Sequence, residues 1–347
     1  MPPQPEQLVL PFRPPPLPGP PALPPASLLD SPTAVVVSAS GGLDSDYAAL
    51  WARRRWSDVP LVLWHAHLPL MDWEETLPHL RALATTLGKC RLVAVQAVYA
   101  LTGERTPTGC AATTLRHCHI VEDGDRWFGP AQDDDPDVLL TLLDFAQRAR
   151  QGQPPTTRRR WCTSYFKVRL FDTWARERRV KLGDRPLLLS GERWPESPAR
   201  AQLPPWEWRE AISLQPGHCQ WPEGWQLAWL RPGIAQPLHA VARAVLDAGI
   251  SLHPGYLAQG ETPETLCDPA RDERGRARLS CRVCIYSQTR HLQHALVHHP
   301  EQVRPAIDAV RAYEAATGYH WRQRESLAPL TDPPAPPAGA EHDQERA

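Results

Sequence analysis

The stretch VVVSASGGLDSDYAALWARRR, residues 35–55, decides the fold. Its β-branched start is typical of a buried strand, and in its second half Tyr47, Leu50 and Trp51 recur at helical spacing. Between the two lies a loop of small residues at 38–42. The sequence therefore predicts a strand that passes through a glycine-containing loop directly into a helix.

The same alternation of strand and helix patterns continues along the chain. Further strands are expected at 59–67, 90–98, 185–191 and 226–233, and helices at 72–88, 135–152, 163–179, 236–249, 292–299 and 300–318. A βαβαβ order favours an α/β fold with a doubly wound parallel sheet and right-handed crossovers. Residues 99–136 show no regular pattern, and we interpret them as an insertion or lid.

Composition sets the limits of the folded part. Residues 1–32 and 331–347 are rich in proline, which removes amide donors, so we expect a disordered arm and a disordered tail.

The chain has 38 basic and 39 acidic residues, a balance that gives no global attraction to nucleic acid or anionic membranes. With no signal peptide and no long apolar run, we expect a cytoplasmic protein without membrane association.

The small-residue loop has the properties of a phosphate site. Free amides at a strand–loop–helix junction point outward, and the helix dipole favours an anion there. Glycine permits close approach, and serine adds hydroxyl donors. The loop lacks the lysine of a Walker sequence. Asp44 could place a Mg²⁺ ion or cap the helix. The candidate phosphate-binding residues are Ser38, Ser40, Gly41, Gly42, Asp44 and Ser45.

The loop SASGGLDS resembles the SGGxDS signature of the PP-loop ATP pyrophosphatases, whose loop grips the pyrophosphate of ATP. Three later stretches are similar to the phosphoadenosine phosphosulfate (PAPS) reductase branch of that superfamily. They are WCTSYFKVRLFDTWA at 161–175, LLLSGERWPESPARAQLP at 187–204 and PLHAVARAVLDAGISLHPGY at 237–256. The resemblance covers about 33–290 and implies a Rossmann-like nucleotide-binding domain at 33–260, followed by a helical, cysteine-bearing region at 261–330.

Four further residues in these stretches are candidates for the site. Guanidinium groups suit phosphate or sulfate oxygens, so Arg193 and Arg200 could bind them, or could belong to a surface salt-bridge network with Glu196. Lys167 could neutralise a phosphate or lie solvated on its helix, and His253 could contact the ligand or be structural. We assign catalytic roles to Asp44, Lys167 and Arg193, and nucleotide binding to Arg200 and His253.

Two histidines depart from the family pattern. Where the second strand ends, the resemblance leads one to expect an acidic and aromatic turn near the adenosine. His65 and His67 stand there instead, so the base and ribose contacts stay unassigned.

The cysteines suggest a metal or redox group. Without an export signal, thiols are expected to be reduced. Cys281 and Cys284 form a CxxC pair, and with Cys162 and Cys267 they make four thiols, the number that a 4Fe-4S cluster or an all-cysteine zinc site needs. Redox thiols and purely structural cysteines are the alternatives. The similar phosphorothioation sulfurtransferases and adenylylsulfate reductases carry iron–sulfur clusters, which favours the cluster.

Together these observations predict an enzyme that binds ATP or an adenylyl sulfate, with Mg²⁺ where ATP is the substrate, for sulfur transfer, reduction or adenylation. No cysteine follows Cys284, whereas PAPS reductases of sulfate assimilation use a cysteine near the C-terminus. The chain is therefore not expected to be a standard PAPS reductase. The alternatives are another PP-loop enzyme, for tRNA thiolation or deazaguanine synthesis, and a non-catalytic subunit of a modification or defence complex. A sulfur donor, a redox partner or a nucleic-acid acceptor would be its partner, and the oligomeric state stays open.

Overall fold

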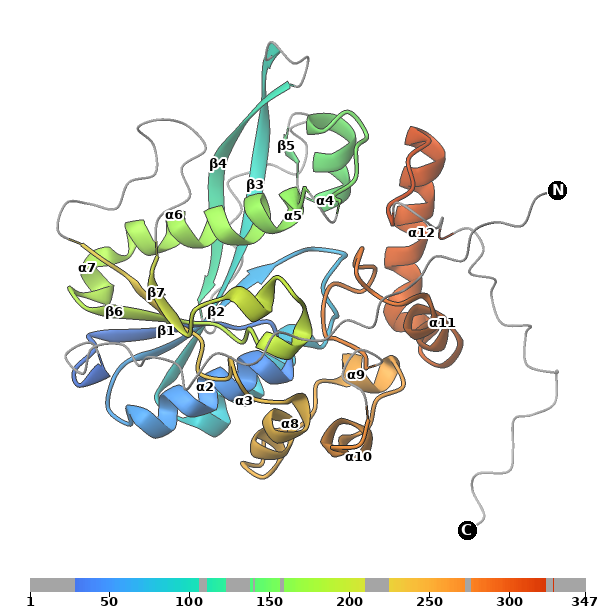
Figure 1. Ribbon diagram of the computed structural model, residues 1–347. Coiled ribbons are helices and arrows are strands. Elements are labelled where there is room, and N and C mark those ends of the chain that lie inside the picture. The colour runs from blue at the N-terminus through green and yellow to red at the C-terminus, as the bar shows by residue number, and fades with distance from the viewer. Residues whose placement is uncertain are drawn as a thin grey trace.

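The computed structural model describes residues 29–105, 111–122, 138–139, 141–156, 159–209, 225–271, 276–322 and 327 (Figure 1). The expected disordered arm, except for its last four residues, and the expected disordered tail lie outside these ranges. In the part of the chain that is described, no helix has the length and apolar character needed to cross a membrane.

One mostly parallel sheet forms the centre of the molecule, with strand order β4-β3-β2-β1-β6-β8-β7 and β5 beside β3. The strands β1, β2, β3, β6 and β8 pair in parallel, while β4, β5 and β7 pair antiparallel. Their bounds are Ala34–Ser38 (β1), Leu61–His67 (β2), Cys90–Arg105 (β3), Ala111–Glu122 (β4), Val138–Leu139 (β5), Pro186–Leu189 (β6), Trp206–Trp208 (β7) and Ala228–Leu230 (β8). The predicted α/β fold with a doubly wound parallel sheet is confirmed.

The chain reverses direction across the sheet at β1. It runs outward through β1, β2 and β3 on one side, then returns to place β6 and β8 on the other side. In the register of β1, Val35 lies opposite Leu61 of β2 and Leu187 of β6. A strand order that reverses in this way opens a crevice at the carboxyl ends of the two central strands, where such sheets bind ligands.

Helices cover both faces of the sheet (Figure 1). On one face lie α2 (Leu43–Arg55), α3 (Thr76–Leu87) and α8 (Leu238–Leu246); on the other lie α4 (Leu142–Asp144), the π-helix η1 (Phe145–Ala149), α5 (Trp161–Thr163), the π-helix η2 (Ser164–Val168), α6 (Arg169–Glu177) and α7 (Arg179–Leu182). The remaining helices are the 3₁₀ turns η3 (Trp194–Glu196) and η4 (Arg200–Gln202), and α9 (Pro254–Ala258), α10 (Pro263–Cys267), α11 (Thr289–His298) and α12 (Pro300–Thr317).

Successive side chains of β1 pack alternately into two hydrophobic cores. Val36 packs into the core beneath α6, and Val35 and Val37 pack into the core beneath α2 and α8. This explains why the strand reads as an unbroken apolar run, since both of its faces are buried.

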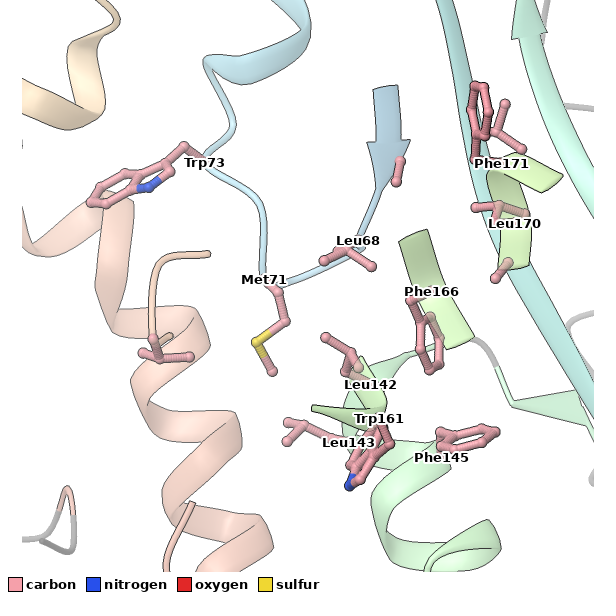
Figure 2. Packing of buried hydrophobic residues seen from close by; sticks show 14 of the residues in the cluster. Leu68, Met71, Trp73, Leu142, Leu143, Phe145, Trp161, Phe166, Leu170 and Phe171 are labelled. Atoms are coloured by element: carbon pink, nitrogen blue, oxygen red, sulfur yellow. The ribbon is translucent and has the colours of Figure 1, made fainter. Parts of the chain in front are cut away.

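The C-terminal helical region packs against the core beneath α6. Figure 2 shows Phe145, Trp161 and Phe166 gathered together, with Met71 between them and the C-terminal helices. The Met71 carbonyl accepts a hydrogen bond from the Arg282 amide at 2.7 Å. The loop after β2 therefore joins the sheet to the C-terminal region.

The expectation of an irregular insertion at 99–136 is wrong in part. The backbone of β3 continues to Arg105 and pairs antiparallel with β4. The segment 111–122 contains β-branched residues, as strands commonly do, and its antiparallel partner satisfies the backbone groups that face β3.

Gly191, just after β6, gives a prediction about stability. A Cβ there would lie 2.4 Å from the carbonyl carbon of Asp44 and 2.6 Å from the Ser45 amide nitrogen, both backbone atoms of α2. Gly191→Ala should therefore lower the free energy of unfolding by about 3 kcal/mol, because backbone must shift.

The matched control is Gly233→Ala, whose Cβ would meet the ring of Tyr47 at 3.2 Å, a side chain that can move. We expect a loss of about 1 kcal/mol for the control. Urea denaturation measures both variants, and equal losses would contradict the account.

Candidate functional site

The loop after β1 lies at the carboxyl end of the central strand and leads into α2. Gly41 has a φ of +77°, and a Cβ on it would lie 2.9 Å from Cδ2 of His253. The position is therefore closed to other residues both by conformation and by space. Gly42 precedes α2 as its N-cap, and no side chain caps the helix there.

Three backbone amides of the loop donate to hydroxyl oxygens. The Ser40 amide reaches Oγ of Ser45 at 3.2 Å, the Gly42 amide reaches Oγ of Ser40 at 3.4 Å, and the Leu43 amide reaches the hydroxyl of Tyr256 at 3.2 Å. These contacts are longer than the usual N–H···O distance of about 2.9 Å. These three donors are thus weakly held, two of them by serine hydroxyls of the same segment and one by Tyr256 of α9.

Asp44 and Arg193 form a close pair. Nε of Arg193 donates to Oδ1 of Asp44 at 2.6 Å, and the Arg193 side chain is only 5% exposed. The amide of Arg193 donates to Glu196, whose carboxylate also pairs with Arg200. This is the salt-bridge alternative raised from the sequence, and it ties the loop after β6 to the first turn of α2.

Arginines also gather at the rim of the site. Burial lowers the pKa of Arg200, and the nearby guanidinium groups of Arg278 and Arg160 lower it further, against the opposite effect of Glu192 and Asp44. Arg160 and Arg278 are exposed. The sequence reasoning missed both of them, although the basic run at 158–160, just before the WCTSYFK stretch, was a signal for the first.

His253 is a structural histidine in this arrangement. Its Nδ1 accepts from the Gly255 amide at 2.9 Å and so caps α9, which leaves the proton on Nε2, 3.2 Å from Oγ1 of Thr76. Burial, followed by the neighbouring His79 and His65, lowers the pKa of His253 to about 3. Its ring is therefore neutral at pH 7.

Two histidines and a carboxylate meet beside the loop. Oδ2 of Asp72 lies 3.2 Å from Nε2 of His65 and 3.0 Å from Nδ1 of His67. Burial alone would raise the pKa of Asp72, but its hydrogen bonds with His65 and His67 outweigh burial and hold the pKa well below its usual range. The sequence had placed both histidines at this point without assigning them a role.

Lys167 lies with three of the four candidate cysteines. Burial would lower the pKa of Lys167, but Cys281, Asp72, Cys284 and Cys162 raise it. Burial raises the pKa of Cys281 to about 12, although Lys167 opposes that shift. Lys167 is partly exposed, and its ammonium group lies within electrostatic reach of these thiols and of the Asp72 carboxylate.

Cys267 does not join this group. It lies at the end of α10, and it packs against the core shared by α2 and α8, whereas Cys162 and Cys281 pack against the other core. The predicted set of four thiols is therefore not formed among the described residues. The positions of these four cysteines therefore do not fit a 4Fe-4S cluster or a zinc site with four cysteine ligands.

A separate hollow lies at the opposite edge of the sheet, at the amino ends of β1 and β2. Its lining includes Lys89, Arg178 and Lys181. None of the candidate residues lies there, and sheets of this topology bind ligands at the other edge.

Comparison with known proteins gives a limited result. No family model matches the chain, and no curated protein matches it. Among solved structures, the chain is similar to the phosphate complex of a phosphoadenylyl-sulfate (PAPS) reductase from Candida auris, with 13% sequence identity and a TM-score of 0.36. The match covers 68% of this chain and 82% of that one.

The buried neutral ring of His253 predicts how stability depends on pH. Since its pKa falls from 6.5 in the unfolded chain to about 3, the unfolded state binds the extra proton between these values, and stability is lost as the pH falls below about 6.5. Between pH 7 and pH 5 this costs about 2 kcal/mol.

The variant His253→Asn keeps a capping oxygen for the Gly255 amide but cannot titrate. Denaturation at the two pH values should show that the variant loses about 2 kcal/mol less than the wild-type protein. The same loss in both proteins would contradict the assignment.

Proposed function

We propose that the chain is an enzyme that binds an adenine nucleotide, ATP or an adenylyl sulfate, through its phosphates at residues 38–45, and uses it for sulfur transfer, reduction or adenylation. The observation that carries this proposal is the glycine loop at the carboxyl end of β1, in which the amides of Ser40, Gly42 and Leu43 donate to hydroxyl groups at 3.2 to 3.4 Å. The loop also lies where the strand order reverses.

A phosphate would improve on the contacts that the loop now makes. The amides of Ser40, Gly42 and Leu43 donate at 3.2 to 3.4 Å to neutral oxygens. Charged acceptors form shorter and stronger hydrogen bonds with backbone amides. The N-terminus of α2, a helix of 13 residues without a side-chain cap, adds a favourable dipole. The preference for an adenine nucleotide rests on the SGGxDS signature.

The charges around the loop suit an anionic ligand. The exposed guanidinium groups of Arg160 and Arg278, beside Arg200, form a basic rim that would attract phosphate or sulfate oxygens. Positioned cations of this kind stabilise negative charge as it develops on a leaving pyrophosphate. The Asp44 carboxylate is paired with Arg193, and a carboxylate paired in this way does not fit the role of a Mg²⁺ ligand. We therefore assign no protein site to that ion.

Two thiols lie near the Lys167 cation. Cys281 and Cys284 are close enough to Lys167 for each thiol to affect its pKa. Burial nevertheless outweighs the effect of Lys167 and raises the pKa of Cys281 to about 12, so the Cys281 thiol is protonated at neutral pH. The preference for sulfur transfer or reduction over an adenylation that involves no sulfur therefore rests on the resemblance of the sequence to the PAPS reductase branch.

The direct test is nucleotide binding by calorimetry, with ATP, ADP and inorganic pyrophosphate as ligands. In Gly41→Ala the added Cβ meets the His253 ring, and the φ of +77° is strained, so the loop must change shape. We expect the affinity for each ligand to fall at least about tenfold, which is about 1.4 kcal/mol.

The matched control is Gly88→Ala at the end of α3, which also has a positive φ, +59°, but no atom within 4 Å of the added Cβ. It should bind as the wild-type protein does. Wild-type protein that binds none of the ligands, or a folded Gly41→Ala that keeps full affinity, would contradict the site. If ATP binds but pyrophosphate is never released, with sulfide or transfer RNA present, the chain is a binding subunit rather than an enzyme.

A further inference from the structure

We propose that His65, His67 and Asp72 bind one divalent ion of a first-row transition metal. One ligand atom from each of the three residues lies within 4.8 Å of the others. Within the described ranges, no other three histidine, cysteine or acidic residues come together in this way. The proposal does not depend on the nucleotide-binding function.

The distances between the ligand atoms fit a shared ion. Oδ2 of Asp72 is 3.0 Å from Nδ1 of His67 and 3.2 Å from Nε2 of His65. Two ligands bound at about 2.1 Å from one ion, at right angles or somewhat wider, are about 3.0 to 3.4 Å apart. The distances from the carboxylate to both histidines are therefore already those of a shared ion.

The environment of His65 is that of a metal-binding histidine. Its Nδ1 lies 2.9 Å from the carbonyl oxygen of Ala39, which can only accept, so Nδ1 carries a proton. In the neutral ring, Nε2 then directs its lone pair toward the carboxylate of Asp72. Histidine ligands of metals are usually held in this way, by a hydrogen bond from the other ring nitrogen to a carbonyl or carboxylate group.

The two remaining ligands are also positioned by the fold. His65 and His67 are two residues apart on β2, so both side chains leave the same face of the strand. The Leu68 amide donates to Oδ2 of Asp72 at 2.7 Å and fixes the carboxylate in the turn that follows. The three ligands therefore come from one short segment whose backbone is ordered by the sheet.

The ligand set decides the class of ion. Two imidazole nitrogens and one carboxylate oxygen suit Zn²⁺, Fe²⁺, Co²⁺ or Mn²⁺ better than Mg²⁺ or Ca²⁺, which prefer oxygen ligands. Three protein ligands leave coordination positions open. Because His65 is bound to Ala39, next to Ser40, the ion would lie beside the phosphate loop.

A titration of the full-length, metal-free protein with Co²⁺ tests the site. Under exclusion of oxygen, we expect one equivalent to bind and to give the weak visible bands of nitrogen and oxygen ligation. A strong near-ultraviolet band would instead report thiolate ligands and would place the ion on the cysteines.

The variants His67→Ala and Asp72→Asn should each weaken Co²⁺ binding at least tenfold, and Zn²⁺ should displace Co²⁺ from the wild-type protein. The control is His298→Ala, which removes an exposed histidine of α11 that lies near His294. It should leave the affinity unchanged, as should Cys281→Ser with Cys284→Ser.

His67 is half-buried at the end of β2, so its variant is expected to fold, and circular dichroism checks this. No binding by the wild-type protein, unchanged binding in folded His67→Ala, or a loss confined to the cysteine or His298 variants would overturn the proposal.

Discussion

The close contact between the loop after β6 and the first turn of α2 is the constraint on which the site depends. Gly191 lies against the backbone of Asp44 and Ser45 with no room for a Cβ, and Arg193 then pairs with the Asp44 side chain at 2.6 Å. This contact joins the two central strands at their carboxyl ends. It fixes the entry of α2, and therefore the direction of the amides in the glycine loop.

Ionisable side chains that would be costly to bury without a neighbour lie at the same edge of the sheet. The Asp46 carboxylate meets His79 at 2.8 Å, Asp72 meets two histidines, and the Lys167 ammonium group lies among thiols. Each charge thus has neighbours of opposite or polarisable character, as buried ionisable groups require. His253, by contrast, is buried in its neutral form.

Local patterns in the sequence predicted the central part of the fold. The strand–loop–helix at 35–55 depends only on its own residues, and the structure reproduces it. The β3–β4 pairing was missed because it joins segments whose strand character depends on each other. Cys267 was misplaced for a similar reason: the CxxC spacing is local, but the packing of α10 against α8 carries Cys267 to a different core. Sequence also could not decide whether Arg193 meets a phosphate or a carboxylate, because Asp44 lies 149 positions away.

Hydrogen–deuterium exchange with and without ATP tests the central claim most directly, since it locates the nucleotide without any substitution. Binding at the glycine loop predicts slower exchange of the amides at 40–46 when ATP is present, with little change at the opposite edge of the sheet. Unchanged exchange at 40–46, or protection confined to the hollow lined by Lys89, Arg178 and Lys181, would contradict the account.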